Sequence, residues 1–265
     1  MPFASKRPGS ERASEPEAAR RLGSDPMTAI GAHGLDLLNR AIIRCCRCPR
    51  LVEYRRRVAR EKRRAFASET YWGRPVPATG DPGAGILIVG LAPGAHGSNR
   101  TGRMFTGDGS GDFLTPALFR AGLASQPTST RIGDGLTLQG VYIVAVAHCA
   151  PPDNKPTAQE MADCRPYLAK HLDLLDGVHV IVALGKIAFD GLLVTLEQRG
   201  LVRARPRPRF AHGAEYDLGP YHLIATYHPS RQNTQTGRLT PAMLDTIFAR
   251  ANRAARPRSG ASHRG

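Results

Sequence analysis

A glycine-rich segment follows one of the apolar runs of the chain and carries side chains suited to a phosphate-bearing ligand. Residues 90–111, GLAPGAHGSNRTGRMFTGDGSG, contain seven glycines, which let the main chain approach a partner closely. Between them, Arg100 and Arg103 suit phosphate groups, Phe105 offers a flat stacking surface, and Asp108 is a carboxylate flanked by glycines. The segment lacks both GxxxxGK[ST] and GxGxxG, which excludes the two commonest nucleotide-phosphate motifs.

A second polar segment follows another apolar run near the C-terminus. Residues 228–238, HPSRQNTQTGR, begin with His228, and a neutral imidazole donates one hydrogen bond without first being protonated. A single histidine is more often structural, but the Pro-Ser that follows and the position at a strand end favour a functional role here. Arg231, Gln232 and Arg238 suit contact with a polyanion, for example in a minor groove.

Four of the five cysteines have the spacing of a metal-binding set. Cys45 and Cys48 form a C-x-x-C pair, and Cys149 and Cys164 lie far downstream. In a cytosolic protein, such cysteines are metal ligands or free thiols before they are disulfides. Four thiolates suit either zinc or an iron–sulfur cluster, and the spacing does not choose between them. Two alternatives stay open: Cys46 replaces Cys45 in the set, or the two downstream cysteines are ordinary buried residues.

The charge of the chain predicts a polyanionic partner. In 265 residues, 37 Lys and Arg stand against 22 Asp and Glu, a formal net charge of +15. The alternative is a general bias of composition toward arginine. Residues 50–64, RLVEYRRRVAREKRR, carry eight basic side chains, which suit a solvated helix face or, as we favour, a surface that follows DNA phosphates.

The sequence has no run of about 18 apolar residues and no apolar secretory signal, so we expect a cytoplasmic protein without a membrane partner.

The elements that must position these segments form an alternating pattern of strands and helices. Four apolar runs predict strands at 85–91, 141–149, 179–185 and 221–229. Apolar strands without polar alternation, separated by helices, indicate a sheet covered on both faces. We therefore predict an α/β fold, a three-layer αβα sandwich with a central, mostly parallel four-stranded sheet. Ligands bind beyond the carboxyl ends of such strands, so the two polar segments should meet at one edge.

The helices and tails complete this organisation. The helix expected over 157–175 begins with a capping-box pattern of Thr157 and Glu160, and Pro166 is expected to split it. Further helical patterns cover residues 35–45, 186–200 and 240–256. We predict a disordered N-terminal tail over 1–33, a single domain over 34–250 and a basic disordered C-terminal tail over 251–265.

Two long motifs carry a family resemblance. Residues 90–111, together with HPSRQNTQTGRLTPAML at 228–244, resemble the uracil-DNA glycosylase superfamily, and its iron–sulfur-containing family 5 in particular. The resemblance runs from about residue 35 to about residue 250. It implies hydrolysis of the N-glycosidic bond of uracil, and of hypoxanthine or other deaminated bases, in double-stranded or single-stranded DNA. It also implies a 4Fe–4S cluster held by Cys45, Cys48, Cys149 and Cys164.

For the reaction, the resemblance implies a nucleotide flipped out of the duplex and a sugar that becomes cationic as the base leaves. We expect His228 to donate a hydrogen bond to the departing base, and Asp108 to stabilise the sugar cation or orient the water. Asp108 takes this role because GLAPG has Ala92 where many superfamily members have Asp, Asn or Glu. The alternative is that Asp108 only caps the turn before GSGDFL. Asn154, a common turn residue type, is a further candidate for contacting the base or the water.

The remaining site residues are expected around the flipped nucleotide. Its base stacks on Phe105, and the glycines allow the DNA backbone to come close. The residues expected to contact the nucleotide are Gly90, Ala92, Pro93, Gly94, Phe105 and Ser230. The arginines expected at the DNA backbone are Arg100, Arg103 and Arg231. The motifs place no lysine for Schiff-base chemistry, so we expect a monofunctional glycosylase, acting as a monomer.

Two other classes of protein would also account for part of the sequence. A zinc-dependent base deaminase requires an H-x-E sequence paired with P-C-x-x-C, and no H-x-E occurs in the chain. A DNA-binding module stabilised by a metal cluster, without glycosylase activity, would explain the charge and the cysteines. It would not explain two such polar segments at the ends of strands.

Overall fold

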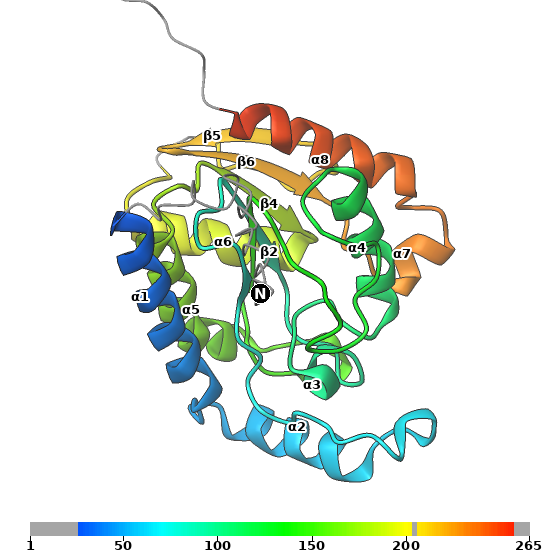
Figure 1. Ribbon diagram of the computed structural model, residues 1–265. Helices are drawn as coiled ribbons and strands as arrows, with labels where there is room; N and C mark the ends of the chain where they lie inside the picture. The colour runs from blue at the N-terminus through cyan, green and yellow to red at the C-terminus, as the bar shows by residue number, and fades with distance from the viewer. Residues whose placement is uncertain (1–25, 203–205, 257–265) are drawn as a thin grey trace, which may run out of the picture.

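The fold is organised around a six-stranded sheet (Figure 1). The computed structural model describes residues 26–202 and 206–256, so most of both expected tails, 1–25 and 257–265, lies outside the described residues. The strand order is β1-β3-β2-β4-β6-β5. The strands are β1 (Thr79–Gly80), β2 (Ile86–Gly90), β3 (Val141–Ala145), β4 (Val180–Leu184), β5 (Glu215–Leu218) and β6 (Tyr221–Thr226).

The four predicted strands form the parallel centre of this sheet. β2 pairs in parallel with both β3 and β4, and β4 pairs in parallel with β6. The predicted α/β architecture is therefore confirmed, but the sheet has six strands rather than four. The two additional strands, β1 and β5, are antiparallel edge strands. β1 has only two residues, and β5 reads EYDL with two exposed acidic side chains, so neither carries an apolar run.

Helices cover both faces of the sheet. One face packs against α6 (Lys186–Gln198) and α5 (Ala158–Leu174), on which α1 (Pro26–Ile43) lies in turn; α8 (Pro241–Ala255) and α4 (Gly109–Arg120) cover the other face (Figure 1). The remaining helical elements are α2 (Pro49–Glu61), α3 (Ser98–Thr101), α7 (Arg231–Gln235) and the short 3-10 turns Arg64–Phe66 and Pro152–Asn154.

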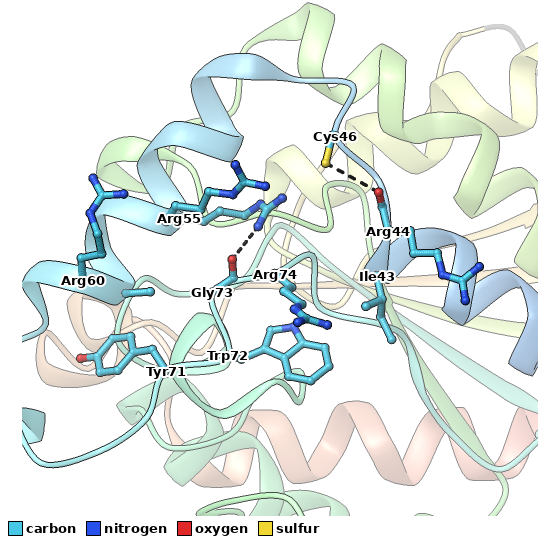
Figure 2. A pocket seen from close by; sticks show the side chains of 11 residues that line it. Ile43, Arg44, Cys46, Arg55, Arg60, Tyr71, Trp72, Gly73 and Arg74 are labelled. Carbon is cyan, nitrogen blue, oxygen red and sulfur yellow. Dashed lines mark hydrogen bonds between the residues drawn. The ribbon is translucent and has the colours of Figure 1, made fainter.

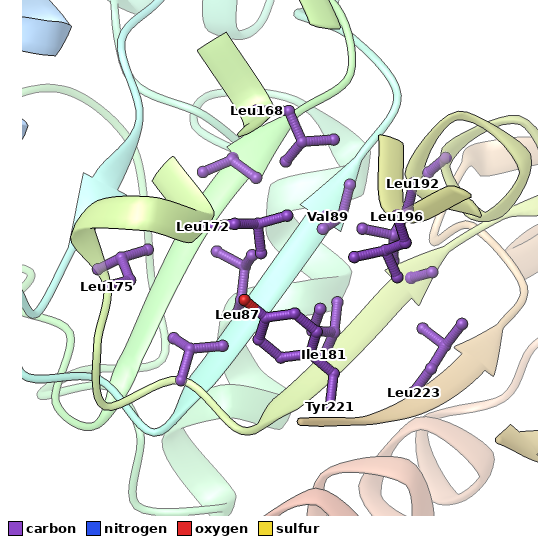
Figure 3. Close-up of a cluster of buried hydrophobic side chains, with 14 of the residues drawn as sticks. Leu87, Val89, Leu168, Leu172, Leu175, Ile181, Leu192, Leu196, Tyr221 and Leu223 are labelled. Atoms are coloured by element: carbon purple, nitrogen blue, oxygen red, sulfur yellow. The ribbon is translucent and has the colours of Figure 1, made fainter. Parts of the chain in front are cut away.

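Successive residues of each central strand enter different layers of the core. In β2, Leu87 and Val89 belong to the cluster under α5 and α6 (Figure 3), whereas Ile86 and Ile88 face α4 and α8. Because both faces are buried, the strand shows an unbroken apolar run rather than alternation. Each such side chain contributes about 1.5–3 kcal/mol through removal from water.

The structure differs from the expected domain bounds at both ends and from the expected course of one helix. α1 begins at Pro26, inside the segment expected as an N-terminal tail, and α8 ends at Ala255, in agreement with the helical pattern over 240–256 but inside the expected C-terminal tail. The capping box at the start of α5 is present, with the Thr157 hydroxyl accepting from the Glu160 amide at 3.1 Å. Pro166, however, does not split α5, because buried side chains anchor the helix on both sides of it. None of the described helices combines the length and hydropathy needed to cross a membrane.

Candidate active site and cysteine cluster

The glycines of the 90–111 segment make room for the protein's own side chains. A Cβ on Gly90, at the end of β2, would lie 2.9 Å from the ring of Phe105. On Gly94 and Gly97, a Cβ would lie 2.7 and 1.8 Å from Oδ2 of Asp108. These positions therefore hold the Phe105 ring and the Asp108 carboxylate against the main chain. These glycines were expected to let the DNA backbone come close, but the contacts at these positions are with side chains of the protein itself.

Asp108 is the N-cap of α4. Its Oδ1 accepts from the amides of Ser110 at 3.0 Å and Gly111 at 3.1 Å, so the capping alternative is correct as far as this oxygen is concerned. The second oxygen points to Gly94 and Gly97 without a protein donor among the described residues. Burial raises the pKa of Asp108 above its usual value, and the two amides act in the opposite direction. The side chain thus has one oxygen engaged in capping α4 and one oxygen without a hydrogen-bond donor among the described residues.

Phe105 has a backbone conformation that non-glycine residues rarely adopt. Its φ is +49°, in the left-handed region that costs most residues about 1–2 kcal/mol. A Cβ on Gly111 would lie 2.2 Å from the Phe105 carbonyl oxygen, so α4 must begin with glycines for the chain to pass here. The ring lies beside the imidazole of His228, with centroids 6.0 Å apart and planes at 34°. The two polar segments at 90–111 and 228–238 therefore meet at the carboxyl ends of β2 and β6, as predicted.

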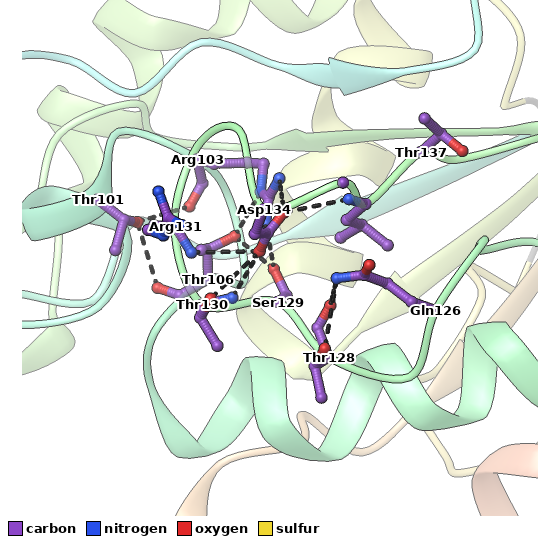
Figure 4. A network of polar contacts seen from close by, with 12 residues as sticks. Thr101, Arg103, Thr106, Gln126, Thr128, Ser129, Thr130, Arg131, Asp134 and Thr137 are labelled. Carbon is purple, nitrogen blue, oxygen red and sulfur yellow. Dashed lines mark hydrogen bonds and ion pairs between the residues drawn. The ribbon is translucent and has the colours of Figure 1, made fainter.

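A buried polar network holds the turn around Phe105 (Figure 4). Arg103 forms a two-pronged ion pair with Asp134 at 2.7 and 3.0 Å, and also donates to Thr106 and Ser129. The Thr106 and Ser129 hydroxyls share a hydrogen bond of 2.7 Å. Although burial acts to raise the pKa of Asp134, Arg103 and three backbone amides hold it well below its usual value. Arg103 is fully occupied by these partners, so the expectation that it contacts DNA phosphates is not retained.

Arg100 is likewise occupied within the protein. It is 8% exposed, pairs with Glu69, and donates to the carbonyls of His96 and Gly107, each at 2.8 Å. Its guanidinium also stacks over the ring of Phe66 at 4.0 Å. Arg100 therefore fastens the glycine-rich segment rather than facing solvent, and its expected role as a DNA contact is also not retained.

His228 lies where the chain leaves β6. Burial lowers the pKa of its imidazole to about 4, so the ring is neutral at pH 7. Its Cβ packs 3.0 Å from the position of a Cβ on Gly185, whose φ of +90° belongs to glycine. Its carbonyl accepts from the side chain of Asn233 at 2.8 Å, which fastens the start of α7 to the strand end. The residue is therefore fixed from both β4 and α7.

Of the remaining predicted residues, some lie near Asp108 and His228 and others do not. Arg231, exposed at the start of α7, lies against Gly109 next to Asp108, and Ser230 is the N-cap of α7 with no side-chain capping bond. Ala92 packs beside the cysteines rather than beside Phe105, and Pro93 is buried. Asn154 is exposed in the Pro152–Asn154 turn with a φ of +56°. Within the described residues, no hydrogen bond joins it to Asp108 or His228, so its role stays a prediction.

The four expected cysteines come together from three parts of the chain. Cys45 and Cys48 lie between α1 and α2, Cys149 lies beyond β3, and Cys164 lies in α5. Burial raises the pKa of the last three thiols to about 12, and the Cys45 thiol acts on each of them in the same direction. Cys46, by contrast, is exposed and its Sγ faces the Arg44 carbonyl at 3.6 Å. The arrangement favours Cys45 over Cys46 as the fourth member of the set.

Several positioning residues gave no signal in the sequence. Asp134 and Ser129 belong to a loop without a motif, and only their contacts with Arg103 connect them to the site. Asn99, fully buried, donates to the Arg55 carbonyl at 3.3 Å and so joins α3 to α2. Gly185 has a positive φ, and the sequence could have indicated this because the glycine directly follows an apolar strand.

Comparison with known proteins agrees with this geometry. The profile of the Uracil DNA glycosylase superfamily matches residues 77–252. The chain belongs to this superfamily. Within it, the chain is 55% identical over 212 residues to the type-5 uracil-DNA glycosylase of Thermus thermophilus, covering 80% of this chain and 94% of that protein. It is 50% identical over 229 residues to the type-5 uracil-DNA glycosylase of Mycobacterium tuberculosis, covering 86% and 84%. A type-4 uracil-DNA glycosylase of Pyrobaculum aerophilum is 31% identical over 201 residues, covering 74% and 83%. The similarity is thus to the type-5 branch.

Proposed function

We propose that this protein is a monofunctional DNA repair glycosylase that removes uracil from DNA and leaves an abasic site. The observation that carries the proposal is the meeting of two distant motifs: Phe105 lies on Gly90, at the end of β2, and its ring lies beside His228, at the end of β6. Membership of the superfamily and the high identity to type-5 enzymes support the same conclusion. The net charge of +15 suits a DNA substrate.

The chemistry assigned to these residues follows from their environment. The bond between C1′ of deoxyribose and the base nitrogen breaks, and its electron pair leaves with the base as an anion. Water adds to C1′ of the resulting cation and loses a proton to solvent, and the departed base takes up a proton from solvent. Neutral His228 donates a hydrogen bond to the departing base, where negative charge develops. The free oxygen of Asp108 stabilises the cationic sugar or accepts a hydrogen bond from the water. Phe105 stacks on the base, and Arg231 contacts the adjoining phosphate.

The cysteine set fits an iron–sulfur cluster. Burial and the neighbouring cysteines raise the pKa of three of these thiols. Such thiols lose their protons only beside a compensating positive charge, which iron ions supply. In the described part of the chain, no three His, Cys, Asp or Glu side chains are grouped closely enough to hold a metal ion, so the choice of an iron–sulfur cluster rests on the family resemblance. We assign a 4Fe–4S cluster to Cys45, Cys48, Cys149 and Cys164. When bound, it supplies a cross-link between the α1–α2 connection, the end of β3, and α5.

We extend the proposal to hypoxanthine and other deaminated bases. The candidate site around Phe105 and His228 offers a base few fixed polar side chains, and a site with fewer fixed hydrogen bonds rejects fewer analogues. Asn154 and Ser230 are the remaining candidates for polar contacts with the base. We expect the enzyme to act as a monomer on the DNA of the cytoplasm, in single or double strands.

Base release tests the proposal directly. The protein is incubated with labelled duplexes carrying one uracil, one hypoxanthine or no lesion, and abasic sites are then cleaved with alkali. We expect breaks at uracil that depend on alkali, a single-turnover rate strongly reduced by Asp108→Ala and by His228→Ala, and DNA binding largely retained. Binding without release of any base would instead support the non-enzymatic DNA-binding module.

A further inference from the structure

A cationic pocket lies outside the candidate active site. Its volume is about 590 Å³, and it lies between α2, the end of α1 and residues 71–74 (Figure 2). Five arginines line it, together with Trp72, the single tryptophan of the chain: the exposed Arg44, Arg56, Arg60 and Arg74, and the buried Arg55. No acidic side chain is among the residues that line this pocket. Neither Phe105 nor His228 belongs to it, so it is a separate site.

The exposed arginines of this pocket are not paired with carboxylates. Arg50, Arg100, Arg103 and Arg120 each pair with a carboxylate, whereas the four exposed pocket arginines have no such partner among the described residues. Like charges gathered without counter-charge repel one another, so the cluster destabilises the free protein. An anion in the pocket would remove this repulsion.

Arg55 provides a second observation at this pocket. It lines the same pocket and is only 3% exposed. Although burial raises the pKa of the Cys149 thiol, the Arg55 side chain also acts on that thiol and lowers its pKa. One terminal nitrogen donates to the Gly73 carbonyl at 2.5 Å, and its Nε is buried without a hydrogen-bond acceptor among the described residues (Figure 2). A buried donor of a charged group left unpaired costs about 1–3 kcal/mol or more. An acceptor entering from the pocket would satisfy it.

The pocket is joined to the candidate active site through α3. The amides of Trp72 and Gly73 donate to the carbonyls of Arg100 and Asn99 at 2.8 and 3.0 Å, so the 71–74 segment rests on α3. At its other end, α3 begins at Gly97, which lies against the carboxylate of Asp108. The pocket and the candidate active site are therefore linked through one short helix, and DNA that contacts both would pass this part of the fold.

We propose that this pocket binds phosphate groups of the DNA backbone that flanks the flipped nucleotide. The inference rests on the proposed function, because it assigns the DNA to the same face. The four arginines and the unpaired Arg55 nitrogen supply donors for phosphate oxygens, and a volume of about 590 Å³ is within the range of ligand pockets. The guanidinium of Arg74 lies 5.8 Å from the centre of the Trp72 ring. A DNA strand bound in the pocket would therefore change the environment of the Trp72 indole.

The test uses the double variant Arg56→Ala/Arg60→Ala, two exposed positions on α2 where alanine favours the helix. The matched control is Arg253→Ala/Arg256→Ala, which removes the same charge at the end of α8, on the opposite side of the molecule in Figure 1. Binding of an oligonucleotide duplex with a non-hydrolysable uracil analogue is followed by Trp72 fluorescence at several salt concentrations. Excision by the wild-type protein is measured in parallel.

We expect DNA to quench Trp72 in the wild type and the control, and to quench it much less in the double variant. The slope of log K against log salt should fall by up to about 1.8 in the double variant alone, because each phosphate contact contributes about 0.9. A lysine version of the double variant, which keeps both charges, should restore the slope and serves as a check on folding.

Three results would overturn the inference. The first is an unchanged slope in the double variant. The second is an equal loss in the α8 control, which would indicate net charge rather than a site. The third is quenching by inorganic phosphate at the concentration of the DNA phosphates, which would identify a site for free anions. A wild-type protein that binds DNA and releases no base would contradict the proposed function while leaving the pocket assignment intact.

Discussion

Gly97→Ala is the sharpest test of how the glycine-rich segment works. Gly97 precedes α3 with a φ of −101° and a ψ of −103°, outside the helical and extended regions, so alanine there adds some backbone strain, as it does at the control position below. Its Cβ would, in addition, lie 1.8 Å from Oδ2 and 2.4 Å from Cγ of Asp108. Ordinary contact begins at about 3.4 Å, so the carboxylate must move by more than an ångström. The substitution therefore displaces Asp108 and leaves every other proposed catalytic group in its place.

The size of the effect follows from what Asp108 loses. Its two bonds to the amides of Ser110 and Gly111, 3.0 and 3.1 Å long, form the cap of α4, and loss of such a cap costs about 1 kcal/mol of stability. A displacement of about 1 Å at a reacting centre reduces the rate by roughly 100-fold. We therefore expect Gly97→Ala to be modestly destabilised and to lose most of its excision rate.

The assay compares single-turnover uracil excision and urea unfolding in Gly97→Ala and in Gly122→Ala. Gly122 has a φ of +73°, and a Cβ added there would meet no atom within 4 Å, so alanine adds only backbone strain, about 1–2 kcal/mol. The control should thus match or exceed the loss of stability while excising at the wild-type rate. Wild-type excision by Gly97→Ala would refute the proposed role of the Asp108 carboxylate.

Three further predictions concern the cysteines, His228 and the buried ion pair. Cys45→Ser should lower the iron and sulfide bound per protein, whereas Cys46→Ser should not, because the Cys46 thiol faces away from the other thiols; equal losses would reverse this choice. Burial lowers the pKa of His228 from 6.5 to about 4, so the folded protein keeps the ring neutral as the pH falls through 6.5. Single-turnover rates should show no inflection near pH 6.5, and an inflection that disappears in His228→Ala would contradict this. Asp134→Asn leaves the part-buried Arg103 without its counter-charge and should cost about 1–3 kcal/mol in urea unfolding, whereas Asp245→Asn, in an exposed pair, should cost less than about 1 kcal/mol.

The parts of the fold that could be predicted are those whose burial is complete. The four central strands are recognisable because both of their faces are covered, which requires continuous apolar runs such as ILIVG and VIVAL. β5 was not predicted because an edge strand needs at most one apolar face and so shows no continuous apolar run. Its Glu215 and Asp217 are exposed to solvent. α4 gave no clear signal, since it begins with glycines and contains Pro116, both of which normally mark the absence of a helix.

Residue type alone did not reveal which side chains face a ligand. Arg100 and Arg103 have the chemistry of phosphate contacts, and their charge is used instead to pair with Glu69 and Asp134 inside the protein. The partners lie 31 residues away in each case, one before and one after the motif. Such pairs depend on where distant loops fold, which no local pattern records. Arg231, by contrast, is exposed beside Gly109, where it is open to a ligand.

The glycine-rich segment is best understood as a device for fixing two side chains before the substrate arrives. Phe105 has a positive φ, and the bonds among Arg103, Thr106 and Ser129 hold the turn in which it lies. Gly90 then receives the ring, while Gly94 and Gly97 receive the carboxylate of Asp108. A stacking surface and an anion held this firmly need no reorganisation when a base is flipped toward them, and electrostatic catalysis depends on such preorganisation. Strain at Phe105 is therefore consistent with selection for a fixed site rather than for stability, because the same turn built with glycine would be easier to form and less able to hold a base.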